Sequence, residues 1–463
     1  MNRARPGRLF LLATVSLATL APGTLLAQEG TGVRGTLSVT QGLEFSDNRR
    51  LEATSAGDTL TSVTRLGFGV LSETRTERFT FNLNGIFEDS SGDGASEDEG
   101  FRTTNRSASL GYRREGANAR LEFGASFSNR EIQDDFIGFF VDGEFDPRAL
   151  KLEGGEVDRT SYSARLQTGL EGPFGFDVRL RTSDRTYEDT TDPDLVDQSR
   201  LSVDTVSSFR LRPNFSLRAL AGVGSVEEEG VFLEENERSY LGFGIETETA
   251  RGLTLRGDIL FDETETLLDG ETTDEEDGVG FDVSVEQARP NGSVGLAVSS
   301  RIDGAGRRTS ASVSRGIELP TGGLSLSLGI VDQEDGDLGL TSSLRYLRET
   351  PVGTITADLA QQPSTQIDEA FLNTSISLGI NRDLNELSQV GATLRYGSTS
   401  VLSDGEEDSD TRTTLGLTYD RELTQDWGLT AGVEYTRIDE ADEADRSSST
   451  VFFNIGRDFD FGF

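Results

Sequence analysis

Carboxylates and arginines are the most abundant ionisable side chains in this sequence. The 463 residues include 81 Asp and Glu against 43 Lys and Arg, and neither histidine nor cysteine is present. Without cysteine, the chain offers no disulfide, thiolate ligand or thiol nucleophile. Without histidine, it lacks the usual general base of serine hydrolases at neutral pH. We therefore predict that the protein is not an enzyme.

Acidic runs are the remaining candidates for a reactive or metal-binding site. Two carboxylates can act as acid and base, and oxygen ligands can hold Ca²⁺. Divalent ions could also bridge such runs to lipopolysaccharide. The run with the most suggestive spacing, "DQEDGD" at 332–337, lacks the full calcium-binding loop with its terminal Glu. We interpret these runs as solvated loops, and we predict no metal site and no cofactor.

Arginines recur on the polar side of segments in which apolar and polar residues alternate. The arginines placed in this way are Arg120, Arg165, Arg179, Arg181, Arg210, Arg218, Arg256, Arg301, Arg345 and Arg395. Carboxylates such as Asp177, Asp258 and Asp282 share this side. One interpretation is that arginines and carboxylates pair across neighbouring strands. The other is that some arginines bind or guide an anionic solute, and the sequence leaves both open.

The elements that must position these side chains are β-strands. In "VRGTLSVTQGLEF" at 33–45, apolar residues occupy most odd positions and polar residues occupy the even ones, which is the period of a strand. The same alternation returns at 118–128, 176–182, 253–261, 279–285 and 427–435. No segment of comparable length shows a helical stripe. Segments 293–303 and 352–360 are rich in glycine and alternate only weakly.

Connections between these segments alternate between short turns and longer acidic loops. Short turns lie at 75–78, 114–117 and 249–252, and acidic loops at 89–100, 269–278, 403–410 and 439–446. This asymmetry is typical of an outer-membrane barrel. We predict an all-β fold, a transmembrane antiparallel up-and-down β-barrel of about 22 strands within a range of 16–24. A β-sandwich array and a β-solenoid are the soluble alternatives.

The first 27 residues have the features of an export signal. Arg3, Arg5 and Arg8 precede an apolar run at 9–21, and Ala27 precedes the expected cleavage. We therefore divide the chain into a signal peptide, 1–27, and a barrel, 28–463. Only residues 28–32 would separate the mature start from Val33, so we expect no plug domain of the kind that fills 22-stranded transporters. That expectation argues against a TonB-dependent receptor.

The chain ends in "RDFDFGF", with Phe459, Phe461 and Phe463 at alternate positions. This ending resembles the outer-membrane assembly signal, a terminal Phe preceded by alternate aromatics. The resemblance implies recognition by the barrel assembly machinery. We expect the protein in the bacterial outer membrane, in contact with lipid and lipopolysaccharide, and we expect no nucleic-acid partner.

The longest loop, 129–158, is too apolar for a freely solvated segment. Its large apolar residues include Phe136, Ile137, Phe139, Phe140 and Phe145. Folding into the barrel mouth would bury them and constrict the bore. An additional hairpin above the membrane is the other interpretation, and the two stand even.

The stretch "GTLSVTQGLEFSDNRRLE" at 35–52 resembles the first strand and loop of the β-barrel porin-2 family, through Phe45, Ser46, Asp47 and Asn48. The resemblance implies an association with exopolysaccharide systems. We predict an outer-membrane channel, a conduit for an exopolysaccharide or for small hydrophilic solutes. The alternative is a non-conducting structural or adhesive barrel that acts through its acidic surface loops.

Overall fold

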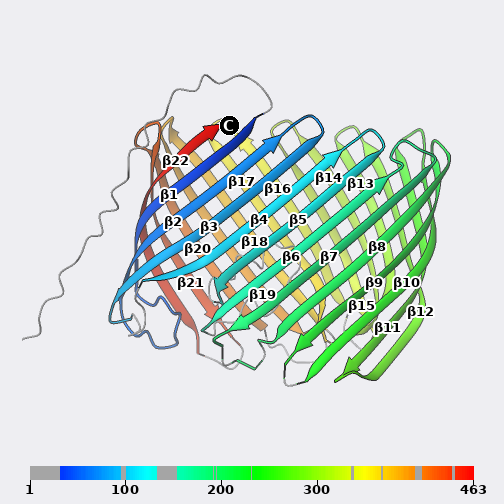
Figure 1. Ribbon diagram of the computed structural model, residues 1–463, viewed down its shortest axis with the longest axis horizontal. Coiled ribbons are helices and arrows are strands. Elements are labelled where there is room, and N and C mark those ends of the chain that lie inside the picture. The colour runs from blue at the N-terminus through cyan, green and yellow to red at the C-terminus, as the bar shows by residue number, and fades with distance from the viewer. Residues whose placement is uncertain are drawn as a thin grey trace, which may run out of the picture.

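The computed structural model consists almost entirely of antiparallel β-strands (Figure 1). It describes residues 32–94, 101–132, 154–190, 192–193, 195–230, 232–334, 338–366, 369–401, 409–440 and 444–462. The strands are β1 (Val33–Ser46), β2 (Thr59–Glu73), β3 (Glu77–Gly92), β4 (Arg102–Glu115), β5 (Ala119–Glu131), β6 (Glu156–Thr168), β7 (Phe174–Glu188), β8 (Asp197–Arg212), β9 (Phe215–Glu229), β10 (Leu233–Glu248), β11 (Leu253–Leu268), β12 (Glu271–Arg289), β13 (Gly292–Asp303), β14 (Gly306–Leu319), β15 (Gly322–Gln333), β16 (Gly339–Thr350), β17 (Gly353–Gln366), β18 (Glu369–Asn385), β19 (Ser388–Val401), β20 (Ser409–Glu422), β21 (Trp427–Asp439) and β22 (Arg446–Gly462). In this part of the chain, no helix is long and apolar enough to cross a membrane.

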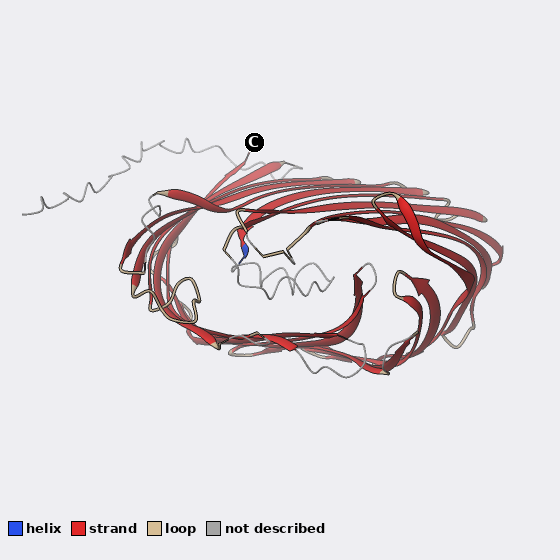
Figure 2. Ribbon diagram, turned by 90° about the horizontal axis from the view of Figure 1, so that it is seen from below, coloured by secondary structure: helices blue, strands red, loops and turns tan. Residues whose placement is uncertain are grey.

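Each strand pairs with its neighbours in the sequence, and the first strand pairs with the last. The register of β1 against β22 runs from Arg34 opposite Gly462 to Ser46 opposite Thr450. This pairing closes a 22-stranded antiparallel barrel. Viewed along the barrel, the ring of strands is a flattened oval (Figure 2).

The two faces of the strands differ in polarity. On the outer face, Leu43 lies opposite Phe453 across the seam between β1 and β22, and the two side chains are 51% and 50% exposed. Large exposed apolar residues of this kind recur on nearly every strand. Such a surface would be costly in water, whereas an outward apolar band flanked by interfacial aromatics is what a lipid bilayer requires.

Strand ends show where the apolar band stops. On the outer face, Phe261 lies opposite Val279, and the next outward pair is Glu263 opposite Asp277. Carboxylates at these positions mark an edge of the band, because charged side chains are costly in lipid. This edge is the extracellular one, since connections at this end are the longer ones, as 47–58 between β1 and β2 compared with 74–76 between β2 and β3 at the other end. The strands β9–β12 therefore extend beyond the bilayer.

One predicted loop is part of this extension. The acidic run 269–278 forms only a two-residue turn, Asp269–Gly270, and then strand β12 from Glu271. Asp269 and Gly270 have φ values of 53° and 79°, as a tight hairpin turn requires. The prediction of a long loop here was wrong, because backbone pairing with β11 overrides the polar composition.

Candidate functional site in the barrel lumen

The inner face of the barrel is lined by small polar residues and ion pairs. On β18, the inward residues Asn373, Ser375 and Ser377 are followed by Gly379. The amide of Asn373 donates to Ser364 Oγ at 2.6 Å and accepts from Thr399 Oγ1 at 2.7 Å. Short side chains that bond to one another along the wall do not fill a wide bore.

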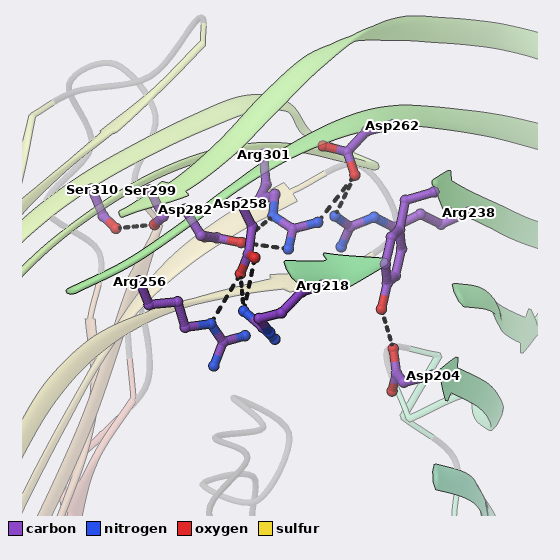
Figure 3. A network of polar contacts seen from close by, with 11 residues as sticks. Asp204, Arg218, Arg238, Arg256, Asp258, Asp262, Asp282, Ser299, Arg301 and Ser310 are labelled. Atoms are coloured by element: carbon purple, nitrogen blue, oxygen red, sulfur yellow. Dashed lines mark hydrogen bonds and ion pairs between the residues drawn. The ribbon is translucent and has the colours of Figure 1, made fainter. Parts of the chain in front are cut away.

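Asp258 on β11 is the centre of the first ion-pair cluster (Figure 3). It accepts hydrogen bonds from Arg218 Nη1 at 2.6 Å and from Arg256 Nε at 2.9 Å. The side chains of Arg218 and Asp258 are only 6% and 1% exposed. At this burial, each charge depends on the other for its stabilisation.

Asp262 is the centre of the second cluster, two inward positions further along β11 (Figure 3). Arg238 lies 3.1 Å and Arg301 3.2 Å from Asp262 Oδ1, and Arg301 also contacts Asp282 at 2.6 Å. Tyr240 stacks beneath the Arg301 guanidinium at 5.3 Å. The Tyr240 hydroxyl donates to Asp204 at 2.8 Å. Together the two clusters form a neutral, cross-linked wall over β8–β13.

Other predicted arginines also meet carboxylates. Arg165 binds Asp177 through two nitrogens at 2.7 and 3.0 Å, and Arg179 joins them at 3.3 Å. Arg345 pairs with Asp358 at 2.9 Å, with both side chains well exposed in the lumen. This is the cross-strand pairing that one of the two interpretations expects.

Arg120 lies at the periplasmic rim. It binds Glu115 at 2.8 Å, and Arg113 binds the second oxygen of the same carboxylate at 2.7 Å. The hydrogen bonds from Arg120 and Arg113 lower the pKa of Glu115 from its usual value. Arg210 is also at this rim, and its guanidinium donates to the carbonyls of Gly172 and Leu170 in the β6–β7 turn.

Arg181 and Arg395 differ from the rest of the predicted set. Neither makes a hydrogen bond or ion pair within the described part of the chain. Arg181 is an exposed inward residue of β7. Arg395, on β19, lines a cavity of about 520 Å³ at the seam of the barrel. The predicted arginines are thus spread around the lumen and do not form one site.

The cavity at the seam, which we call the seam cavity, includes five arginines that the sequence analysis did not single out: Arg49, Arg65, Arg106, Arg130 and Arg412. Arg65 lies on the polar side of β2, as the ten predicted arginines lie on the polar sides of their segments. The alternation of apolar and polar residues could therefore have identified it. Arg49 lies between β1 and β2, where no alternation exists to indicate a direction. A second cavity of about 840 Å³ lies nearer the periplasmic rim, beside Arg34, Arg78, Asn82 and Asp460.

The terminal aromatics lie on the outer face of β22. Phe461 is opposite Gly35 and stacks with Phe68 at a centroid distance of 6.3 Å. Arg457 lies 4.5 Å from the Phe459 ring and 5.8 Å from the Trp427 ring, which is an interfacial cation–π arrangement. Phe463 lies outside the described residues. Recognition of this end by assembly machinery stays a prediction.

The predicted constriction residues Phe136, Ile137, Phe139, Phe140 and Phe145 also lie outside the described residues. The base of their loop is described. There, Ile132, Val157 and Leu195 form a buried apolar cluster with Tyr187 packed against it. In the described residues, no group of three or more acidic side chains is arranged to hold a metal ion.

No family model matches this chain, and no curated protein matches it. The resemblance to the porin-2 family therefore has no support beyond its short motif. Solved structures do match in fold. A ferric enterobactin receptor from Pseudomonas aeruginosa, in complex with enterobactin, is 12% identical with a TM-score of 0.54, covering 94% of this chain and 82% of that chain.

Two further solved structures give the same result. The FrpB iron transporter from Neisseria meningitidis is 10% identical with a TM-score of 0.56, covering 92% of this chain and 81% of its own. The ferric-catecholate import receptor Fiu from E. coli is 12% identical with a TM-score of 0.55, covering 93% and 82%. At this identity the likeness concerns the fold alone.

These matches correct the predicted fold class. The predicted class excludes plug-filled 22-stranded transporters, yet the fold resembles solved structures of receptors and transporters of iron compounds. The prediction of a plug-free class rested on the short segment before Val33, which carries no information about the barrel wall. The described residues contain no plug helix. The protein is a closed 22-stranded β-barrel of the bacterial outer membrane.

Proposed function

We propose that this barrel is an outer-membrane transport protein that passes hydrophilic solutes through its lumen. The observation that carries the proposal is the inner wall, where short polar side chains and neutral ion pairs line β7–β19. A wall of this kind stays hydrated, whereas a purely structural barrel would gain stability from a packed apolar interior. The names of the similar structures, receptors and transporters of iron compounds, agree with transport at this level.

Solute flux through the purified full-length protein tests this proposal. Folded protein is first identified by its heat-dependent migration in detergent gels, and it is then inserted into planar bilayers and liposomes. We expect discrete conductance steps, and swelling of liposomes in an isosmotic solution of a small sugar. Folded, inserted protein that gives neither conductance nor swelling would overturn the proposal.

The acidic extension of β9–β12 favours one alternative, a non-conducting barrel that acts through its extracellular surface. Outward carboxylates there face each other across strands, as Glu263 faces Asp277 and Glu265 faces Glu275. Like charges in direct opposition destabilise a sheet, so this surface is not explained by the stability of the barrel. Loss of surface attachment on replacing these residues, with conductance absent in the intact protein, would support the alternative.

A further inference from the structure

The seam cavity has more arginines than carboxylates among its lining residues. Its lining includes six arginines, Arg49, Arg65, Arg106, Arg130, Arg395 and Arg412, against three glutamates, Glu44, Glu88 and Glu434. The chain as a whole has a formal charge of −38. A local excess of arginine in so acidic a protein needs a specific explanation.

Ion pairs account for part of the cluster. Arg65 binds Glu44 at 2.5 Å and the Asn454 side-chain oxygen at 3.0 Å. Arg49 binds Glu88, also at 2.5 Å, and donates to Thr61 at 2.7 Å. Such pairs hold guanidinium groups in fixed positions, which lowers the entropic cost of binding a further anion.

Two arginines of the cavity remain without such partners. Arg130, near the extracellular end of β5, and Arg395, on β19, make no hydrogen bond or ion pair within the described residues. Both are half-buried. The guanidinium group stays protonated in proteins, so neither side chain can become neutral to avoid the cost of burial. Within the described residues, therefore, no carboxylate pairs with either charge.

Hydroxyl groups surround these charges on the strands between them. Thr414 and Thr436 bond to each other at 3.2 Å, and Ser46 bonds to Ser448 at 2.9 Å across the seam. Guanidinium forks and hydroxyls are the donors that recognise carboxylates and phosphates. The volume of about 520 Å³ suits a small solute.

The wall over β8–β13 provides the contrast. There Arg218, Arg256, Arg238 and Arg301 meet Asp258, Asp262 and Asp282, with Asp204 bound to Tyr240. Arginine in this lumen is therefore neutralised on one wall and left in excess at the seam. A general need for charged wall residues does not explain that difference.

We infer that the seam cavity is a binding site for a small polyvalent oxyanion, a carboxylate or a phosphate, on the extracellular half of the lumen. This inference rests on the proposed transport function and names its substrate class. The acidic rim repels anions at long range, so the site gives short-range retention to an anion that has entered. The solute would be held by Arg130 and Arg395, with Arg412 and the hydroxyls as further donors.

Calorimetric titration of the detergent-solubilised full-length protein with pyrophosphate, citrate and sucrose tests this site. We expect pyrophosphate, citrate or both to bind, and sucrose not to bind. Arg395→Gln should weaken binding about tenfold, as expected for loss of one charge-assisted contact. The double variant Arg130→Gln/Arg395→Gln should abolish it. Binding of only one anion would identify the oxyanion as phosphate or carboxylate.

Arg181→Gln is the matched control, because it removes another lumenal arginine that has no partner among the described residues and does not line the cavity. Its affinity should stay within about twofold of the wild type, since exposed charges more than about 10 Å apart are screened at 0.1 M salt. The inference is overturned if the wild type binds neither anion, if sucrose binds as well, if Arg181→Gln weakens binding as much as Arg395→Gln, or if the double variant binds normally. Normal heat-dependent migration establishes that each variant is folded.

Binding and transport are measured separately, so the two proposals can fail separately. A conducting barrel that binds no oxyanion would remove the inference and leave the proposed function. A barrel that binds the oxyanion but gives neither conductance nor liposome swelling would overturn the proposed function and leave the binding site.

Discussion

Gly35 on β1 lies beneath the ring of Phe461 on β22, and a Cβ atom at Gly35 would stand 2.1 Å from Phe461 Cε2. The ring is held there by stacking on Phe68. The glycine therefore allows an aromatic side chain to cover the seam where the first and last strands meet. This contact links local sequence to closure of the barrel.

Gly35→Val should weaken the closed barrel, because the added side chain has to displace the Phe461 ring. Overpacking of this kind costs about 1–3 kcal/mol. The measurement is the temperature at which the folded band is lost in detergent gels. Gly257→Val is the control, since no atom lies within 4 Å of a Cβ at Gly257. Equal loss in both variants would show that the seam contact is not limiting.

Replacing Phe459 and Phe461 with serine should block assembly in cells, because these residues are the predicted recognition end and also belong to a lipid-facing row. The readout is the amount of heat-modifiable protein in the outer-membrane fraction. Val451→Ser/Phe453→Ser removes two lipid-facing side chains from the same strand, further from its end. That control should assemble in larger amount. Normal levels of the Phe459/Phe461 variant would mean that these aromatics are not the signal.

Asp258→Asn should destabilise the barrel strongly, since it leaves the buried Arg218 without its closest compensating charge. Breaking a buried pair costs about 3–5 kcal/mol. In contrast, Asp358→Asn breaks the exposed pair with Arg345 and should cost about 0–1 kcal/mol. Unfolding of the refolded protein by guanidinium chloride in detergent micelles would compare the stability of the two variants. Similar midpoints for both variants would contradict the role assigned to burial.

The extracellular extension should become more stable as the pH falls. Burial, followed by the nearby charges of Glu334 and Asp274, raises the pKa of Glu276 from its usual value. A carboxyl group with a raised folded-state pKa favours the folded state when protonated. Its contribution is therefore greatest in acid and is lost as the pH rises through the raised pKa.

Glu276→Gln should consequently slow amide hydrogen exchange at the β11–β12 turn at neutral pH, and should have no effect in acid. The control variant is Glu318→Gln, which removes a charge near the periplasmic end of β14. Its amide exchange is measured at the same β11–β12 turn. A Glu276→Gln effect that is identical at both pH values would rule out titration of this group as its cause.

Ion selectivity should be mildly cationic at low salt and should weaken at high salt. The acidic extracellular rim attracts cations, and its field fades as the Debye length falls from about 10 Å at 0.1 M to about 3 Å at 1 M. Reversal potentials across a salt gradient measure this.

Deleting residues 133–152 should raise single-channel conductance if loop 129–158 enters the bore. Unchanged conductance after the deletion would place the loop outside it.

The sequence predicted the membrane-level part of the strands better than their ends. Alternation at 253–261 and 279–285 corresponds to the centres of β11 (Leu253–Leu268) and β12 (Glu271–Arg289). Both strands continue beyond the apolar band, where Glu263 and Asp277 replace apolar residues on the outer face. Alternation of apolarity reports only the lipid-facing segment, so the extension appeared as loop. The glycine-rich strands β13 and β17 were the weakest signals for the same reason, since glycine has no side chain to mark a face.

The sequence predicted which charged residues face the lumen, but not which of them form ion pairs. The sequence placed Arg301 and Asp282 on the inner face, but it did not single out Asp262, which joins Arg301 to Arg238. Which arginine meets which carboxylate depends on the register between strands. The seam cavity was missed for a related reason, because closure brings Arg395 on β19 near Arg65 on β2, and no local pattern reports that meeting.

The closing pair, β1 with β22, also sets the order in which this barrel can form. Every other strand pair is a local hairpin or a neighbour along the chain, whereas Leu37 must find Phe459 across nearly the whole sequence. Relative to a turn of a few residues, bringing such distant segments together costs on the order of 4 kcal/mol in chain entropy. Until that contact forms, the sheet has two unpaired edges that could pair with another chain. Closure of the seam is therefore the step at which a helper protein would have the greatest effect, because it could hold the edge of β1 until β22 pairs with it.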